Sequence, residues 1–300
     1  MHALIVILAI AVIIPVIGFC LSSIVIHPRT RTYEDTCRSE CEKGNMSKEA
    51  FDSLEKEEVR IQSPYGYELY GLFFPNAASK KTAIICHGIT YTIYGSVKYM
   101  DMFLKRGYNV LIYDHRNHGK SGGTDTTFGY YEKYDLRACT DWVFERFGEN
   151  SIVGIHGESM GAAIALQNSL IDPRVSFYIA DCPFSDLEEL LKYRLKMEFK
   201  LPSFPAMDMV KLFVRLRTGM RLSQVSPIKD ISEVKTPVFF VHGSEDTYIP
   251  PQMSIDMYNI KNGVRKLYLA PNAKHAQSIA MNREEYDRLV GEFLREICCD

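Results

Sequence analysis

The chain begins with a hydrophobic run that differs from everything after it. From Ala3 to Ile26 no residue carries a charge. About 24 residues at ~1.5 Å each make a helix of roughly 36 Å, longer than the ~30 Å hydrocarbon core of a bilayer. This pattern predicts a transmembrane anchor over residues 1–27, with a cleaved signal peptide as the alternative. The anchor is favoured because no Lys or Arg precedes the run and no small-x-small site follows it.

The residues after this run are rich in charge. The basic ones closest to it are Arg29, Arg31, Arg38 and Lys43, whereas the N-terminal side offers only the α-amine and His2. The positive-inside rule then predicts a single-pass protein whose main domain lies in the cytoplasm. Residues 28–56 are expected to form a juxtamembrane linker, with one short helix that begins after the cap residue Ser47.

From residue 57 onward, short apolar runs alternate with stretches of helical spacing. The runs are rich in β-branched and aromatic residues and are bounded by Gly, Pro, Asn or Asp, which predicts strands. They read VRIQS, ELYGLFF, TAIICHG, NVLIYDH, SIVGIHG, VSFYIADC, PVFFVHG and KLYLAP. The first two have no helix between them and predict a hairpin that turns at Gly66 and Tyr67. The others predict a mostly parallel sheet with helices on both faces, so residues 57–300 are expected to form one α/β domain.

Composition and charge exclude several classes of partner. A chain of 300 residues that is 46% hydrophobic can fill a large core. Its formal net charge is −2 and its Lys and Arg residues are scattered, so no nucleic-acid partner is expected. No cofactor is expected either, because the GKSGG segment lacks phosphate-loop spacing and no strand is followed by G-x-G-x-x-G. No metal site is expected, because the chain has no metal-type CxxC pair.

Four of the eight cysteines fall in segments that read as buried or as part of the anchor: Cys20, Cys86, Cys139 and Cys182. Cys37 with Cys41, and Cys298 with Cys299, are the pairs that an oxidising compartment would join. Adjacent cysteines form a disulfide only with strain, so free thiols are expected.

The motif GESMGAA places Ser159 between a strand and a helix. A sharp strand-to-helix turn brings its neighbours close together, which suits Gly157 and Gly161 because neither has a side chain. Such a turn exposes the serine hydroxyl at the edge of the sheet, and the helix N-terminus offers amides to a developing oxyanion. Ser159 is therefore the candidate nucleophile, with a purely structural turn as the alternative.

A nucleophilic serine needs a base, and few of the eight histidines qualify. Three of them immediately precede a glycine at a strand end and are expected to support turns: His87, His156 and His242. His115 and His118 belong to the loop after Asp114. His2 and His27 flank the anchor, so the remaining candidate is His275, in a loop after the last strand.

The other groups of the site follow from the loops at the strand ends. Asp246 after the penultimate strand is the favoured acid, with Glu245 open as an alternative. Met160 and Ile89 are the expected backbone donors to the oxyanion, with Thr90 in reserve. The loop that carries Ile89 also contains His87 and Gly88, which are expected to support it.

Taken together, these motifs resemble the α/β-hydrolase fold serine hydrolases, from about Glu58 to the C-terminus. The motifs that carry the resemblance are YGYELYG, CHGIT, YDHRNHGKSGG, GESMG, ADCPFSDL, TPVFFVHGSEDTYIP and NAKHA. Within this family the chain is similar to membrane-anchored bacterial hydrolases and to the depalmitoylating branch. The resemblance implies ester or thioester hydrolysis through Ser159, Asp246 and His275. Tyr65, where the family often has Asp, and Asn117, where it usually has Gly, depart from the pattern.

An insertion at about residues 187–236 occupies the position where this fold carries its cap. Two stretches within it have Leu, Met, Phe and Val at helical spacing, which suits an acyl chain or simply packing on the sheet. The expected function is hydrolysis of ester or thioester bonds in lipid-like or small acyl substrates, at a membrane reached through the N-terminal helix. The alternatives are a peptidase or amidase on the same triad, and a non-catalytic binding module.

Overall fold

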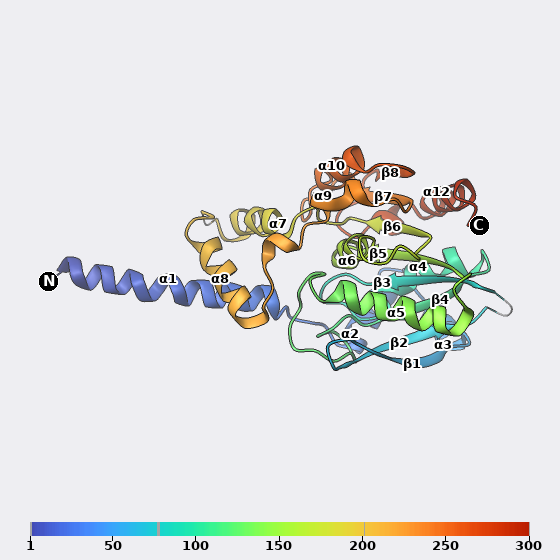
Figure 1. The fold of residues 1–300 in the computed structure, drawn as a ribbon, viewed down its shortest axis with the longest axis horizontal. Helices are drawn as coiled ribbons and strands as arrows, with labels where there is room; N and C mark the ends of the chain where they lie inside the picture. Colours follow the sequence, from blue (N-terminus) through green and yellow to red (C-terminus); the bar gives the residue numbers. More distant parts are fainter. Residues whose placement is uncertain (1, 77–78, 201, 300) are drawn as a thin grey trace.

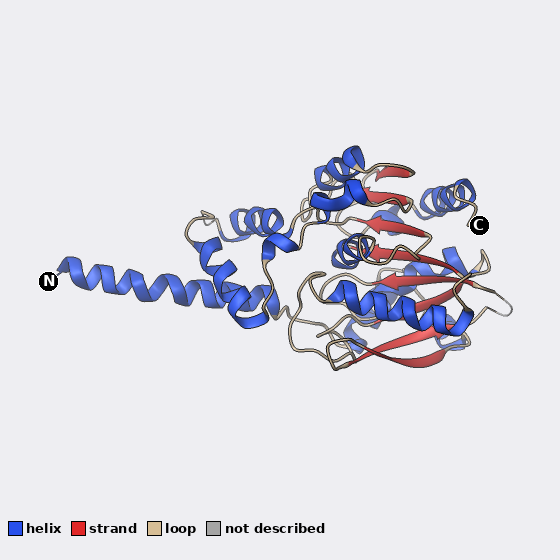
Figure 2. Cartoon of the chain, viewed as in Figure 1, coloured by secondary structure: helices blue, strands red, loops and turns tan. Residues whose placement is uncertain are grey.

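An eight-stranded sheet forms the centre of the molecule, as Figures 1 and 2 show. The computed structural model describes residues 2–76, 79–200 and 202–299, with side chains described from residue 12 onward. The strand order is β1-β2-β4-β3-β5-β6-β7-β8. The strands are β1 (Glu57–Gln62), β2 (Glu68–Phe74), β3 (Lys81–Cys86), β4 (Asn109–Tyr113), β5 (Ile152–Glu158), β6 (Phe177–Asp181), β7 (Val238–Gly243) and β8 (Arg265–Ala270).

All eight strands coincide with the runs expected from the sequence. β1 and β2 form the predicted antiparallel hairpin, with Gly66 at a φ of +83° in its turn. β2 also pairs antiparallel with β4, and the remaining pairs are parallel. In a parallel sheet the carboxyl ends of the strands meet at one edge, so the loops with the candidate site residues are brought together there.

Helices cover both faces of the sheet. Successive side chains of a strand point to opposite faces, and both sets are buried. In β3, Ile84 and Cys86 pack in one core cluster, while Ala83 and Ile85 pack in the other. The helices on the first face are α5 (Glu132–Phe147), α6 (Met160–Asn168) and α10 (Gln252–Ile260); those on the second are α4 (Tyr94–Leu104), α11 (Ser278–Met281) and α12 (Arg283–Glu296).

The insertion after β6 folds as a series of short helices near the carboxyl ends of the strands. Its helices are α7 (Leu187–Arg194), η1 (Leu195–Phe199), α8 (Ala206–Thr218), η2 (Leu222–Gln224), α9 (Pro227–Asp230) and η3 (Ile231–Glu233). The two helical stretches expected within residues 187–236 are thus present, as α7 with η1 and as α8. We refer to residues 187–236 as the cap.

The N-terminal run forms one helix, α1 (His2–Ile26), which extends away from the sheet with α8 beside it (Figure 1). The sequence predicts a membrane-spanning helix here. Among the residues that the structure describes, no helix is both long and apolar enough to cross a membrane. The side chains of residues 1–11, which belong to the predicted span, lie outside the described ones.

The segment expected as a linker, residues 28–56, is instead folded onto the domain. It contains α2 (Tyr33–Glu42) and α3 (Lys48–Ser53), the latter capped by Ser47 as expected. The side chains of Thr36, Glu40 and Phe51 are buried. The hydroxyl of Thr36 lies 2.7 Å from that of Thr92, so a buried polar contact ties α2 to the domain. Apart from the buried Glu40, most charged side chains of this segment are exposed. Composition alone did not reveal that its short helices pack on the domain.

All eight cysteines are free thiols. Neither Cys37 with Cys41 nor Cys298 with Cys299 forms a disulfide. Burial, followed by the neighbouring Cys41, raises the pKa of the Cys37 thiol.

Candidate active site

The serine motif forms the tight turn that its glycines predict. Ser159 follows β5 directly and precedes α6, with φ 55° and ψ −117°. A Cβ on Gly157 would lie 2.4 Å from the carbonyl oxygen of Gly161, and one on Gly161 would lie 2.3 Å from that of Cys86. No side chain fits so close to backbone atoms, so both positions require glycine. The turn holds the Ser159 hydroxyl at the carboxyl edge of the sheet and at a helix N-terminus.

Ser159, His275 and Asp246 form one hydrogen-bonded chain. The Oγ of Ser159 lies 2.9 Å from Nε2 of His275, and Nδ1 of His275 lies 2.7 Å from Oδ2 of Asp246. The three residues come from the turn after β5, the loop after β7 and the loop after β8. Ser159 and Asp246 are each only 4% exposed. The structure therefore brings together the nucleophile, base and acid candidates that the sequence indicates.

Asp246, rather than its neighbour Glu245, meets the histidine. Glu245 is exposed, whereas Oδ1 of Asp246 accepts a hydrogen bond from the amide of Ile249 at 2.9 Å. Nε2 of His242 also lies 3.2 Å from Oδ2 of Asp246, a contact that the sequence did not indicate. Burial alone would raise the pKa of Asp246, but the hydrogen bonds from His242 and His275 outweigh it and hold the pKa well below its usual range. Asp246 is thus an anion placed to orient the imidazole of His275.

Two backbone amides are available beside Ser159. Ile89 and Met160 line the cavity that opens at this serine. Met160 is the first residue of α6, so its N–H has no acceptor within the helix. The N–H of Ile89 has no protein acceptor within the described part of the chain. The reserve candidate Thr90 is engaged, because its amide donates to Nε2 of His118 at 3.2 Å.

Buried histidines brace the loop that carries Ile89. Nδ1 of His87 donates to the carbonyl of Gly88 at 2.7 Å, and its Nε2 accepts from the amide of His115 at 3.1 Å. Burial, followed by the nearby His118, lowers the pKa of His87 to about 3, so the ring stays neutral. Sequence reasoning assigned His87 to loop support but missed the same role for His115 and His118. Their spacing three residues apart in one loop was the available signal.

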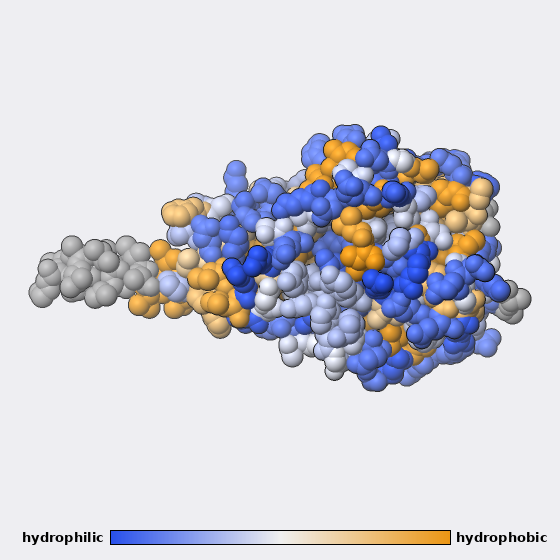
Figure 3. Space-filling model, viewed as in Figure 1, coloured by the Kyte–Doolittle hydropathy of each residue, from blue (hydrophilic) through white to orange (hydrophobic). Residues whose placement is uncertain are grey.

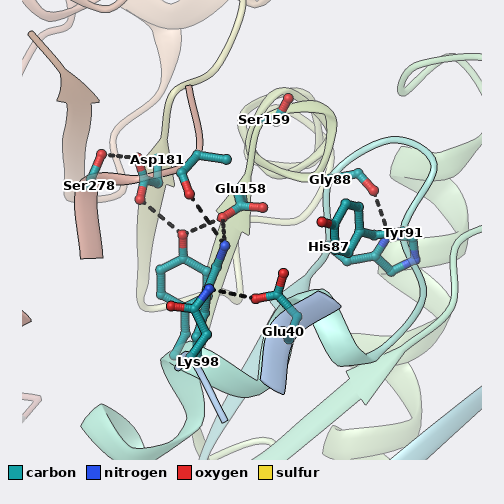
Figure 4. Close-up of polar contacts among 12 residues, drawn as sticks. Glu40, His87, Gly88, Tyr91, Lys98, Glu158, Ser159, Asp181 and Ser278 are labelled. Carbon is teal, nitrogen blue, oxygen red and sulfur yellow. Dashed lines mark hydrogen bonds and ion pairs between the residues drawn. The ribbon is translucent and has the colours of Figure 1, made fainter. Parts of the chain in front are cut away.

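A buried ion pair lies directly beneath the nucleophile, as Figure 4 shows. Nζ of Lys98 in α4 lies 2.5 Å from Oε2 of Glu158, the residue before the serine, and the two side chains are 5% and 8% exposed. The hydroxyl of Tyr99 donates to Glu158 at 2.6 Å and also lies 3.0 Å from Oδ2 of Asp181. Oδ1 of Asp181 accepts from the Ser278 hydroxyl at 2.8 Å. This network joins α4, β5, β6 and α11.

The network also reaches the loop that holds the base. Nζ of Lys98 lies 3.5 Å from the carbonyl oxygen of Ala276, the residue after His275. Burial of Asp181, followed by the charge of Glu158, raises the pKa of Asp181 to about 6. Lys98 therefore contacts residues adjacent to both the nucleophile and the base. No sequence motif marks it, since its partners lie far away along the chain.

One cluster of potential metal ligands occurs among the described residues. Cys182, Asp246 and His275 have ligand atoms within 4.8 Å of one another. Asp246 and His275 use these atoms to hydrogen-bond each other, and burial raises the pKa of the Cys182 thiol well above its usual value. Two members of this cluster therefore belong to the hydrogen-bonded chain that begins at Ser159.

A cavity of about 570 Å³ opens at Ser159, within the size range of small-molecule sites. Its walls are mostly apolar. Those from the domain and the cap include Phe128, Phe184, Leu187, Leu190, Leu191 and Ile249. The candidate nucleophile therefore borders an apolar cavity.

Comparisons with known proteins agree with this fold. The sequence pattern of a family described as "alpha/beta hydrolase fold" matches residues 82–207. The chain is 41% identical over 280 residues to the uncharacterized protein YqkD of Bacillus subtilis (strain 168), covering 93% of this chain and 92% of that protein.

Two further relatives have names that describe an activity. The Pyrococcus furiosus esterase Pf2001 superposes with a TM-score of 0.70 at 31% identity, covering 84% of this chain and 95% of that one. The lysophosphatidylserine lipase ABHD12 of Macaca fascicularis is 27% identical over 240 residues, which are 74% of this chain but only 58% of that protein.

Proposed function

Because the chain belongs to the alpha/beta hydrolase fold family, we propose that it is a serine hydrolase that cleaves carboxylic ester or thioester bonds in lipid-like or small acyl substrates. The observation that carries the proposal is the hydrogen-bonded chain from Ser159 through His275 to Asp246, with distances of 2.9 and 2.7 Å. Nucleophile, base and orienting acid in this order are the arrangement that activates a serine.

The proposed mechanism begins when Ser159 attacks the acyl carbon and Nε2 of His275 accepts the hydroxyl proton. The amides of Ile89 and Met160 stabilise the negative charge on the former carbonyl oxygen, a contribution of ~3 kcal/mol for each donor. The protonated His275, held by Asp246, then gives its proton to the leaving group, and an acyl-enzyme remains. Water activated by the same histidine attacks the acyl-enzyme, which releases the acid and regenerates the serine.

The named relatives support the substrate class. One is an esterase and another is a lipase that acts on a lysophospholipid, so both cleave esters. The apolar walls of the cavity at Ser159 agree with an acyl group as the part of the substrate that is bound. These features favour an ester over an amide, whose poorer leaving group requires more assistance.

The test is hydrolysis of p-nitrophenyl esters by the full-length chain, with Ser159→Ala and His275→Ala as matched variants. We expect hydrolysis by the wild type and none above the uncatalysed rate in Ser159→Ala. Matched p-nitroanilides and thioesters separate peptidase and thioesterase activity from esterase activity. Folded wild-type protein that hydrolyses none of these substrates and does not react with a fluorophosphonate would favour the non-catalytic binding module.

We also propose that α1 attaches the enzyme to a lipid bilayer, with the catalytic domain on the cytoplasmic side. Support comes from the uncharged run Ala3–Ile26 and from exposed apolar side chains on its described part, among them Val12 and Val16. Figure 3 shows further apolar surface on that part of α1 and on the adjoining cap. Flotation of the full-length chain with phosphatidylcholine vesicles, and its loss in a Val12→Glu/Val16→Glu variant, tests the attachment.

Labelling of an exposed thiol tests on which side of the membrane the catalytic domain lies. Cys298 near the C-terminus is exposed and free. If the domain is cytoplasmic, a membrane-impermeant maleimide labels Cys298 only in permeabilised cells. Equal labelling in intact cells would place the domain outside.

A further inference from the structure

The wall of the active-site cavity includes a part of the chain that would ordinarily serve only for attachment. Besides cap residues, the cavity at Ser159 is lined by the C-terminal end of α1, namely Ser23, Ile24 and Val25, and by the next residues, His27 to Arg29. The end of the N-terminal helix therefore borders the same cavity as the candidate nucleophile.

A second cavity, of about 90 Å³, continues beside the first between α1 and the cap. Five residues line both cavities: Ile24, Val25, Leu191, Arg194 and Glu198. The remaining lining residues of the second cavity are Leu21, Leu195, Phe199, Met207 and Val210, all of them apolar. The shared walls make the two cavities neighbours, and together they lead from Ser159 along α1.

The charged residues in these shared walls neutralise each other. Arg194 is bound to Glu198 and its guanidinium lies 3.8 Å from the ring centroid of Tyr248. This pair therefore presents no uncompensated charge to an acyl chain that lies against the wall. An apolar ligand is compatible with such a wall.

α1 is fixed firmly enough to act as a wall. A Cβ on Gly18 would lie 2.2 Å from Cβ of Met209, so α1 and α8 approach closely at this point. Arg217 of α8 donates hydrogen bonds to the hydroxyls of Ser22 and Ser23, at 3.0 and 2.7 Å. At its end, the carbonyl of Ile26 accepts from the amide of Thr126 at 2.8 Å.

Both α1 and the cap also expose apolar side chains. On α1 they include Val12, Val16 and Ile17, and on the cap they include Phe204 and Leu216, which are 78% and 71% exposed. Figure 3 shows that apolar surface continues from α1 onto the adjoining cap. The elements that line the two cavities thus also carry an apolar surface suited to lipid.

We propose that α1 and the cap together form an acyl channel, so that α1 sets the length of the acyl chain that the enzyme accepts from a lipid surface. The substrate is then a long-chain acyl ester whose carbonyl lies at Ser159 and whose chain runs along Val25 toward the second cavity. This inference rests on the proposed hydrolase function. It adds that the N-terminal helix is a specificity element as well as an attachment.

The test compares p-nitrophenyl esters from acetyl to palmitoyl with the full-length chain in phosphatidylcholine vesicles. In the wild type, kcat/KM is expected to rise with chain length until the channel is filled. Val25→Trp fills the channel and should lower the dodecanoyl-to-butyryl ratio of kcat/KM at least tenfold. Val25→Ala enlarges it and should shift the optimum to longer chains. Ile13→Trp, at an exposed position outside both cavities, is the matched control and should change the ratio less than twofold.

A second variant keeps the lining residues intact. Gly18→Val forces α1 away from Met209 and should also lower the dodecanoyl-to-butyryl ratio. Labelling by a small fluorophosphonate reports whether each variant still has an assembled site. If every variant that reacts with the fluorophosphonate keeps the wild-type chain-length profile, the acyl channel is refuted and the hydrolase function stands. Absence of Ser159-dependent hydrolysis in the wild type would overturn the hydrolase function, and the channel with it.

Discussion

Replacing Lys98 by Met is expected to destabilise the protein strongly, because it removes the charge that balances a buried carboxylate. Lys98 is 6% exposed and its ammonium lies 2.5 Å from Glu158. Burial by itself would lower the pKa of Lys98, but the Glu158 charge raises it above its usual value, so the lysine is charged. After the substitution, Glu158 keeps the hydroxyl of Tyr99 as a partner but has no cation beside it.

The expected magnitude follows from the burial of the pair. Removing one partner of a buried ion pair costs about 3–5 kcal/mol, because the other charge remains uncompensated. With an unfolding entropy of ~2.1 cal/mol/K per residue, a chain of this length loses about 1.6 °C in Tm per kcal/mol. Lys98→Met should therefore lower Tm by roughly 5–8 °C.

The assay is thermal unfolding of the full-length chain, with two further variants. Lys105→Met, at the end of the same helix, removes a lysine whose side chain is 44% exposed, and should cost less than about 1 kcal/mol. Lys98→Met/Glu158→Gln removes both charges and should recover at least half of the loss. A Tm for Lys98→Met within 1 °C of wild type, or a double variant less stable than the single one, would refute the reasoning.

Three other substitutions test the site and its surroundings. Gly161→Ala should abolish fluorophosphonate labelling, because its Cβ would lie 2.3 Å from the carbonyl of Cys86; labelling at the wild-type rate would contradict the close approach. Asp246→Asn should lower kcat about 10⁴-fold, because His275 loses the anion that orients it. The exposed neighbour serves as control, and Glu245→Gln should stay within twofold. Burial, followed by the charge of Lys98, lowers the pKa of His156 to about 3, so between pH 6.5 and 3 only the unfolded chain binds a proton there. Stability is therefore lost as the pH falls through this window. Between pH 7 and 5 the wild type should lose about 2 kcal/mol more than His156→Gln, measured by denaturant unfolding, and parallel curves would contradict this linkage.

The sequence indicated the strands and the loops in which the candidate site residues lie, because both depend on local patterns. Each strand is an apolar run bounded by turn residues. Ser159, Asp246 and His275 each follow such a run, so a parallel sheet had to gather them at one edge. Glycine on both sides of Ser159 indicated the tight turn.

The features that the sequence did not reveal depend on contacts between distant segments. Lys98 and Glu158 look like ordinary charged residues until α4 and β5 are packed together. Residues 28–56 appeared to be a linker because their charges outnumber the few side chains, such as Phe51, that are buried. The sequence did not show that α1 lines a cavity, because a uniformly apolar helix has no face that its sequence distinguishes.

The central claim is that Ser159 is a nucleophile activated by His275. The most direct measurement is the intact mass of the full-length chain after reaction with a fluorophosphonate, followed by location of the modified residue. We predict one phosphonyl group on Ser159 of the wild type, none in Ser159→Ala, and much slower reaction in His275→Ala. No adduct on folded wild-type protein, or equal modification of Ser159→Ala, would contradict the claim.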